Sequence, residues 1–462
     1  MANQQKGKTQ NGALKRAAAQ QELLSGDTAR TSRMPGFYKL DVWERLDKLD
    51  EWMALPTKEK WALKNETLTA EQADMLIENV IGVFGMPLGL AVNFRINDKD
   101  YLIPMAVEET SIVAACSHLA KLIRENGKLT ATADPAIMEG QIQLVDLPDI
   151  DRAEKDILEA KSRLLQLANK QDQMLVSLGG GAKDYYVRRI KTESGEMLIV
   201  HLQVNVVDAM GANAVNTMVE TLGPIIAEMT KGELICQIIT NLADKSLVRA
   251  RFDIQVDCLA KGGFSGKQVA ERVVKAYHWA DADPYRATTH NKGVMNGIDA
   301  VILATGNDWR AVEAGCHAYA ARTGRYRSLT RYRIEGDRLI GEIEVPMAVG
   351  VVGGVTKLHP GVAILLKVLG MPSRRELAEV IASVGLVQNV AAVRALVTEG
   401  IQEGHMTLHA RNVAYSAGAW GDTAIRIADQ MVREGRIRFD RARELLKKMV
   451  ARPGDHKGSG ED

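Results

Sequence analysis

Apolar residues recur with two different periods along the chain, and these periods divide it into regions. From about residue 31 to 135 the apolar spacing is typical of helices, with an apolar stretch at ENVIGVFGMPLGLAVNF (78–94). From about 136 the pattern becomes strand-like: IVHLQVNV (199–206) alternates, and TESGE (192–196) has the composition of a hairpin turn. A long helical pattern follows from Ala209 to about Met229.

Further strands and helices are predicted in the second half of the chain. LVRARFDIQV (247–256) alternates, and RIEGDRLIGEIEV (333–345) reads as a hairpin. The last fifty residues form amphipathic patterns such as DRARELLKKMV (440–450). We therefore expect a mixed α and β protein: a discontinuous, largely helical domain (31–135 and 241–400), an inserted small domain with a sheet (136–240), and C-terminal helices (401–452). The polar ends, 1–30 and 453–462, are expected to be disordered.

Composition excludes several classes of protein. The chain has 462 residues and a net charge of +1, which argues against a nucleic-acid-binding surface. Its four cysteines form no CxxC pair, which fits a reducing compartment. We see no uninterrupted apolar run near the ~18 residues that a membrane span needs, and the N-terminus lacks the apolar core of a signal peptide. These features predict a cytoplasmic protein without a membrane partner.

The first candidate for chemistry is PMAVEETSIVAACSHLAKLIR (104–124). Thr110 or Ser111 can cap the helix that follows, which places Glu108 and Glu109 at the helix N-terminus. Two surface carboxylates favoured by the helix dipole are one interpretation. The other is a proton donor, which requires that burial raise the pKa of one carboxyl group.

Glycine use is unusual at SLGGG (177–181) and at VDAMGANAVNTMVE (207–220). Asp208 can cap a helix that starts at Ala209, and the small residues after it leave the first turns almost bare. Such a surface suits either tight helix packing or a phosphate bound by free backbone N–H groups. The ordinary dinucleotide-binding turn is not supported, because the chain lacks GxGxxG here.

Two more segments carry polar groups beside glycine. In PYRATTHNKGVMNGIDAVILATGNDWRAVEAG (284–315), Lys292 and Asp308 could place a fixed cation against a developing oxyanion, or could form a loop salt bridge. In GHMTLHARN (404–412), His405 and His409 are four residues apart, but no acidic residue completes a zinc-protease motif. We therefore predict no metal, and favour a single histidine proton donor or a surface histidine.

Taken in order, six segments resemble the class II 3-hydroxy-3-methylglutaryl-CoA (HMG-CoA) reductases. The resemblance runs from about residue 32 to about 450 and is carried by ENVIG, PMAVEETSIVAA, DAMGANAVNTM, HNKGVMNGIDAV, ATGNDWRAVEAG and GHMTLHARN. It implies interconversion of HMG-CoA with mevalonate and coenzyme A by two hydride transfers, through a thiohemiacetal and mevaldehyde.

The resemblance also implies a role for each matching position. Glu109 matches the family's catalytic glutamate, Lys292 the lysine that polarises the carbonyl, Asp308 the aspartate bonded to both, and His405 the proton donor to the thiolate. The remaining matches are with groups that bind substrate (Ser111, Arg286 and Asn296) and with the dinucleotide site (Asp172, Gly179, Gly180, Gly181, Asp208, Met210, Gly211 and Asn213).

The family's architecture and cofactor follow as further expectations. The resemblance implies a large substrate domain with a long central helix, an inserted small cofactor domain of ferredoxin-like form, and a C-terminal helical flap. It also implies a homodimer, or an assembly of dimers, with active sites shared between subunits. Asp172 matches an aspartate that faces the adenosine ribose in NADH-using relatives, so we expect NADH to be preferred, with NADPH possible.

Two other readings are compatible with the motifs. One is an NAD(P)-dependent dehydrogenase of another acyl-CoA or aldehyde; activity with HMG-CoA but not with acetyl-CoA would separate the two. The other is a non-catalytic homologue that binds coenzyme A. Glu109, Lys292, Asp308 and His405 argue against the second, because a binding protein needs no proton donors.

Overall fold

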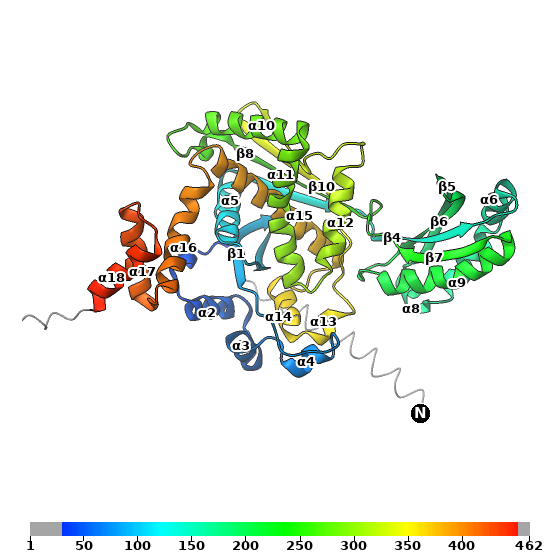
Figure 1. Ribbon diagram of the computed structural model, residues 1–462, viewed down its shortest axis with the longest axis horizontal. Helices are drawn as coiled ribbons and strands as arrows, with labels where there is room; N and C mark the ends of the chain where they lie inside the picture. Colours follow the sequence, from blue (N-terminus) through cyan, green and yellow to red (C-terminus); the bar gives the residue numbers. More distant parts are fainter. Residues whose placement is uncertain (1–29, 451–462) are drawn as a thin grey trace, which may run out of the picture.

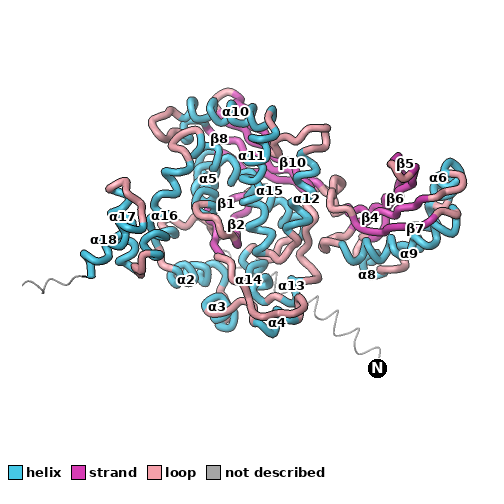
Figure 2. The backbone as a smooth tube through the Cα atoms, viewed as in Figure 1, coloured by secondary structure: helices cyan, strands magenta, loops and turns pink. Residues whose placement is uncertain are grey.

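The computed structural model of the chain describes residues 30–450. The expected N-terminal extension and C-terminal tail therefore lie outside the described residues, apart from Arg30. The described chain forms a mixed α and β structure with a large central part, a smaller part built on its own sheet, and a group of C-terminal helices (Figures 1 and 2).

The region before residue 135 is less helical than its apolar spacing predicts. It holds helices and three strands: η1 (Phe37–Lys39), α2 (Val42–Met53), α3 (Thr57–Lys64), α4 (Ala70–Asp74), β1 (Leu88–Ile96), β2 (Lys99–Ala106), α5 (Ile112–Asn126) and β3 (Gly127–Ala133). β1 and β2 pair as an antiparallel hairpin, and its turn residues Asn97 and Asp98 have φ angles of 49° and 62°. Two positive φ angles are typical of a tight hairpin turn. The helical prediction for 88–94 is wrong because a continuous apolar run does not distinguish a buried strand from a buried helix.

The sheet of the central part joins strands from both sides of the inserted region. Its order is β3-β8-β10-β9, and every neighbouring pair is antiparallel. The other strands are β8 (Leu247–Gln255), β9 (Thr330–Glu335) and β10 (Arg338–Pro346). Because β3 pairs with β8, the chain leaves this sheet after Ala133 and returns to it at Leu247. The intervening residues form the smaller part.

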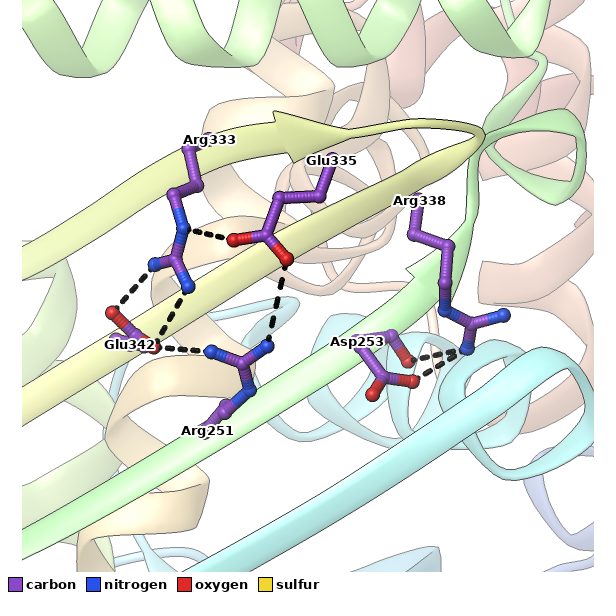
Figure 3. Close-up of polar contacts among 6 residues, drawn as sticks. All are labelled: Arg251, Asp253, Arg333, Glu335, Arg338 and Glu342. Atoms are coloured by element: carbon purple, nitrogen blue, oxygen red, sulfur yellow. Dashed lines mark hydrogen bonds and ion pairs between the residues drawn. The ribbon is translucent and has the colours of Figure 1, made fainter.

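One face of this sheet is apolar and packs on helices, and the other is charged. On the charged face Arg251 and Arg333 both donate to Glu342, at 2.5 and 2.7 Å, while Arg338 donates to Asp253 at 2.5 Å (Figure 3). An antiparallel sheet with one solvated face commonly alternates in this way. Exposed ion pairs of this kind contribute little to stability, so the apolar face holds the sheet in place.

Two long helices form the centre of the core. α11 (Pro284–Ala304) and α15 (Arg374–Leu396) pack closely where Gly297 faces Gln388 and Gly385 faces Ile298. The remaining helices around them are η2 (Val256–Leu259), α10 (Gly266–Ala282), α12 (Trp309–Ala320), α13 (Val355–Leu358) and α14 (Pro360–Val368). A side chain at Gly297 or Gly385 would have to displace the opposite helix, since an added Cβ would lie within 2.9 Å of it. By length and composition alone α15 could cross a membrane, but 83% of its apolar window is buried within this protein.

The smaller part has its own sheet and core. Its strands are β4 (Ile137–Val145), β5 (Gly181–Thr192), β6 (Gly195–Asn205) and β7 (Glu233–Ile239). Helices α6 (Ile150–Glu159), α7 (Lys161–Asn169) and α8 (Gln173–Ser177) connect β4 to β5, and α9 (Ala212–Thr230) connects β6 to β7. The strand order β5-β6-β4-β7, antiparallel throughout, is that of a ferredoxin-like βαββαβ unit.

The C-terminal helices form a separate hydrophobic cluster. They are α16 (Ile401–Ser416), α17 (Gly421–Arg433) and α18 (Phe439–Val450). The cluster is made by Ala and Ile side chains with Met431 and Leu445, and Ile437 and Leu446 pack against it. Phe439, at the start of α18, is 49% exposed. These helices therefore bury apolar surface mainly against one another.

We predict that a chain ending at Gly400 stays folded, because the removed helices have their own core. Size-exclusion chromatography should give one sharp peak, and thermal melting should remain cooperative. A chain ending at Pro372 is the matched control: it also loses α15, whose side chains fill the central core, and it should be insoluble. Aggregation of the Gly400 chain would show that the C-terminal helices are part of the main fold.

Candidate active site

A lysine–glutamate pair lies between α11 and the segment that leads into α5. Glu109 follows β2, and Lys292 lies on α11 with Asn296 one helical turn later. The Lys292 ammonium group donates to the Glu109 carboxylate, and the Asn296 amide donates to the same oxygen at 3.3 Å. Glu109 is 35% exposed and Lys292 58% exposed, so a ligand can reach both. Glu108, its neighbour, points to solvent.

The other residues expected to bind substrate lie on the same two elements. Ser111 is the residue before α5, but it has a left-handed backbone (φ 72°) and its hydroxyl makes no capping bond. The prediction that Thr110 or Ser111 caps this helix fails at Ser111, because its positive φ gives it the wrong geometry. Arg286, near the start of α11, lies over the Trp279 ring at 5.7 Å, and burial lowers the pKa of its guanidinium group.

Buried polar contacts fix the turn of α11 that carries Lys292. The His290 ring bonds to the Thr330 hydroxyl at 2.7 Å, and the Asn389 amide donates to the His290 carbonyl at 2.9 Å. The hydroxyl groups of Tyr332 and Thr330 both donate to the Asn389 oxygen, at 2.6 and 3.1 Å. Burial lowers the pKa of His290 to about 3, so its imidazole is neutral. Sequence analysis missed this network; its signal is Asn389, a polar residue in the apolar run of α15.

The second group of residues lines a cavity of about 690 Å³ between the smaller part and the end of α11. Five predicted site residues lie on its wall: Asp172, Met210, Gly211, Asn213 and Asp308. The Asp308 carboxylate caps α12 by accepting from the Ala311 N–H at 3.1 Å, and Asp172 caps α8 through Leu175 at 2.8 Å. The cavity therefore has two carboxylates, each held by a backbone N–H group.

The bare turn before α9 forms another wall of this cavity. The helix begins at Ala212, and Gly211 with φ 96° precedes it. The prediction that Asp208 caps a helix starting at Ala209 is wrong. The Asp208 carboxylate instead accepts from the backbone N–H of Arg374 at 3.0 Å, at the start of α15. Gly350 lies directly against Met210, where an added Cβ would approach the Met210 nitrogen to 2.3 Å.

The glycines of SLGGG do not line the cavity, and packing explains two of them. An added Cβ at Gly180 would meet the Leu175 side chain at 2.6 Å, and one at Gly181 would meet the Asn169 oxygen at 2.3 Å. Gly179 has φ 86° and open space around it. Close packing thus accounts for glycine at positions 180 and 181. Cofactor contact by the three glycines stays a prediction.

The lysine–glutamate pair lies at the middle of α11, and the cavity lies beyond the C-terminal end of the same helix. From Lys292 to Ala304, α11 advances by about 18 Å, at 1.5 Å per residue, and Asp308 follows its end. Within residues 30–450, Lys292 pairs with Glu109 and makes no contact with Asp308. One chain therefore does not bring the predicted lysine–aspartate pair together. His405 belongs to α16, but its side chain lies outside the described residues.

A cation that can offset charge on an oxygen, and a glycine-lined cavity with two carboxylates, fit an oxidoreductase that acts on a carbonyl compound. The comparisons give the particular family. Residues 41–410 match the model of the hydroxymethylglutaryl-coenzyme A reductases. The chain therefore belongs to this family, and it is an NAD(P)H-dependent oxidoreductase that reduces HMG-CoA.

Relatives and solved structures agree with this membership. The reductase of Archaeoglobus fulgidus is 51% identical over 91% of this chain and 95% of its own length. A probable reductase of Borreliella burgdorferi is 32% identical over 81% and 86%. The Streptococcus pneumoniae reductase structure matches with a TM-score of 0.77 and 39% identity, over 90% of this chain and 99% of that one. Another structure from that organism, with a TM-score of 0.76 and 41% identity over 79% of this chain and 99% of that one, is a class II enzyme bound to NADPH.

We predict that Lys292→Ala keeps its fold but loses at least ~10²–10³-fold in turnover of both HMG-CoA and free mevaldehyde, the loss expected when an oxyanion donor is removed. The reason is that both reductions build negative charge on one carbonyl oxygen. Melting temperature and NAD(P)H oxidation with each substrate are the measurements. Lys267→Ala, at an exposed lysine of α10, is the control. Near-normal turnover by a folded Lys292→Ala enzyme would refute the assignment.

Proposed function

We propose that this chain interconverts HMG-CoA and mevalonate at active sites completed by two copies of the chain. The observation that carries the proposal is the Lys292–Glu109 pair with Asn296 on the same carboxylate. A substrate carbonyl beside Lys292 would have its oxygen stabilised as charge develops, and Glu109 is close enough to move a proton to that oxygen.

The other site residues have roles that fit their chemistry. Arg286 supplies a forked cation for the free carboxylate of the hydroxymethylglutaryl group, and Ser111 and Asn296 supply hydrogen bonds to it. His405 protonates the departing coenzyme A thiolate, and the helices that carry it (401–452) act as a flap over the site. In this proposal residues 31–135 and 241–400 are the substrate domain.

Residues 136–240 are the proposed dinucleotide domain. The cavity lined by Met210, Gly211 and Asn213 fits a nucleotide, because the glycine-rich turn leaves backbone exposed where a phosphate group can approach closely. The bound nicotinamide supplies hydride. Asp172 stands on the same wall, where its carboxylate can accept a hydrogen bond from a ribose 2′-hydroxyl but repels a 2′-phosphate. NADH is therefore the proposed preferred cofactor.

A second copy of the chain is the proposed partner, for two reasons. The distance along α11 separates Lys292 from Asp308 within one chain, so an aspartate at the lysine must come from another chain. The segment after α4 also exposes a row of large apolar side chains, among them Ile81 (104% exposed) and Phe84 (95% exposed). Such patches mark protein interfaces. Localisation in the cytoplasm is proposed because all four cysteines are free thiols.

We predict that two inactive variants restore activity in one dimer. Lys292→Ala and Asp308→Ala chains, co-expressed with different tags and purified as a hybrid, should have about half the wild-type activity per dimer, since one of the two shared sites is then intact. The control is a hybrid of a Glu109→Gln chain and a Lys292→Ala chain. This hybrid would contain one unaltered site only if Glu109 and Lys292 of each site came from different chains.

Because Glu109 and Lys292 pair within one chain, the control hybrid carries one change in each of its two sites and should stay inactive. Activity in the control hybrid together with inactivity of the first hybrid would contradict this arrangement. Full-length homodimers of each single variant, purified in the same way, set the background.

We predict that Asp172→Asn changes cofactor choice without unfolding α8. Asparagine keeps the cap on Leu175 but removes the negative charge, so the ratio of kcat/KM for NADPH to that for NADH should rise about tenfold. Asp172→Ala loses both the cap and the charge. Comparison of the two variants therefore separates the effect on protein stability from the effect on cofactor selectivity. An unchanged ratio in Asp172→Asn, or a wild-type preference for NADPH, would count against a role for Asp172 in cofactor choice.

A further inference from the structure

Another cavity, of about 620 Å³, opens on the charged face of the central sheet. Strands β3, β8 and β10 form its floor, and Arg251 and Glu342 of Figure 3 belong to this floor. Its sides are the C-terminal ends of α10 and α12, the loop 321–329 that follows α12, and the start of β9. None of its lining residues belongs to the site described above.

The wall of this cavity carries more cations than anions. Its charged residues are five arginines and three acids: Arg249, Arg251, Arg322, Arg327, Arg331, Asp281, Glu342 and Glu344. Whether the wall attracts an anion depends on which of these groups are already occupied by one another.

The carboxylates of the floor have both of their oxygens occupied by donors of the protein. Glu342 accepts from Arg251 at 2.5 Å on one oxygen and from Arg333 at 2.7 Å on the other. Glu344 accepts from a tyrosine hydroxyl group at 2.5 Å on one oxygen and from Arg249 at 2.7 Å on the other. These acids therefore leave few acceptor positions facing the cavity.

The arginines keep N–H groups that no protein acceptor occupies. Arg327 donates to one oxygen of Asp281 through Nε, at 3.1 Å, and to the other oxygen through Nη2, which leaves Nη1 without a partner within residues 30–450. Arg331 is exposed on the edge strand β9, and its side chain makes no hydrogen bond or ion pair with the rest of the described chain. A guanidinium group has five N–H donors and no acceptor. The cavity thus presents open donors and occupied acceptors, an arrangement that suits an anion with several oxygens.

The loop beside the cavity is hydrogen-bonded to the residue before Lys292. The Asn291 amide donates to the Arg327 carbonyl at 2.8 Å, and the Asn291 oxygen accepts from the Leu329 N–H at 2.9 Å. Arg327 and Leu329 both line the cavity. Asn291 is buried, so loss of either bond would leave a buried polar group without its partner. A movement of residues 327–329 therefore reaches the helical turn that carries Lys292.

A second contact leads from the cavity to the same turn. Tyr277 lines the cavity and packs edge-on against the ring of Tyr332, with 6.0 Å between the ring centroids. The Tyr332 hydroxyl donates to Asn389, whose amide donates to the His290 carbonyl. The cavity wall and the buried network below Lys292 are thus in direct contact.

We propose that this cavity binds a small molecule with a diphosphate group, and that the bound ligand lowers turnover. A volume of about 620 Å³ suits a small molecule. A phosphoryl group accepts hydrogen bonds from several directions, which suits guanidinium groups on different elements better than a planar carboxylate does.

The ligand acts on the active site through the loop. It competes with Asp281 for Arg327, displaces the residues that bind Asn291, and so moves Lys292 away from Glu109. The binding site itself stands on the cavity and its open donors. Its effect on turnover rests on the proposed function, because only there does the position of Lys292 matter.

Calorimetric titration of the full chain with inorganic diphosphate tests the site without any need for activity. We expect saturable binding with a Kd below about 1 mM. Saturating coenzyme A and NADH should leave this Kd unchanged, because the proposed substrate and cofactor sites lie elsewhere. Arg331→Gln should raise the Kd at least ~tenfold, because it removes charge-assisted hydrogen bonds to the anion.

Two further variants complete the binding test. Arg331→Lys keeps the charge but not the forked donors, so its Kd should lie between those of wild type and Arg331→Gln. Arg325→Gln makes the same change of charge at an exposed arginine of the same loop, outside the cavity wall, and should bind as wild type does. Absence of binding up to about 10 mM diphosphate overturns the site. Binding that coenzyme A or NADH abolishes, or that Arg331→Gln leaves unchanged, also overturns it.

Steady-state turnover tests the effect of the ligand on catalysis. Diphosphate near its wild-type Kd should lower wild-type kcat, with KM for HMG-CoA and for the nicotinamide cofactor unchanged, and should barely alter kcat of Arg331→Gln. Without diphosphate the two proteins should have equal kcat. Binding without any change in wild-type kcat overturns the effect on catalysis, and a rise in KM alone shows competition at the active site and overturns it too. Inactivity of the wild type on HMG-CoA would refute the proposed function and leave the calorimetric result unaffected.

Discussion

An α-helix keeps residues that are several turns apart at a fixed separation, and this constraint on α11 determines how the rest of the site is arranged. Lys292 lies near the middle of α11, and the C-terminal end of the helix, which the turn to Asp308 follows, is about 18 Å further along. A lysine side chain cannot span that separation. The chain therefore presents two incomplete groups of polar residues, one facing Glu109 and the other facing the cavity of the smaller part. In the proposed function, a second chain supplies the aspartate that one chain does not bring to Lys292.

The helix can act as a rigid spacer because its surroundings leave it little freedom. Glycines at the contact with α15 let the two helices approach closely, so movement of one displaces the other. The contacts among His290, Thr330, Tyr332 and Asn389 fix the turn that carries Lys292. A buried polar network of this kind specifies one arrangement, because each donor would lose its partner in any other.

A second set of buried contacts joins the two sheets. The chain crosses from the central part to the smaller part near Asp134 and returns near Ser246. The Arg374 guanidinium group binds both crossings, donating to the Asp134 carbonyl at 3.2 Å and to the Ser246 hydroxyl, while its backbone N–H donates to Asp208. Burial lowers the pKa of Arg374 to about 10, which still leaves it charged at neutral pH. The start of α15 thus holds the cavity wall against the same core that holds α11.

The sequence by itself determined the mixed α and β class, the hairpin of the inserted part and the family, because alternation and motif order depend only on neighbouring residues. It did not determine that 88–96 is a strand or that Asp208 binds the start of α15. Those features depend on contacts between segments far apart in the chain. Tertiary structure alone decided that Lys292 lies beside Glu109 and away from Asp308. The number of residues between two groups gives their distance in space only when the conformation of the intervening chain is known.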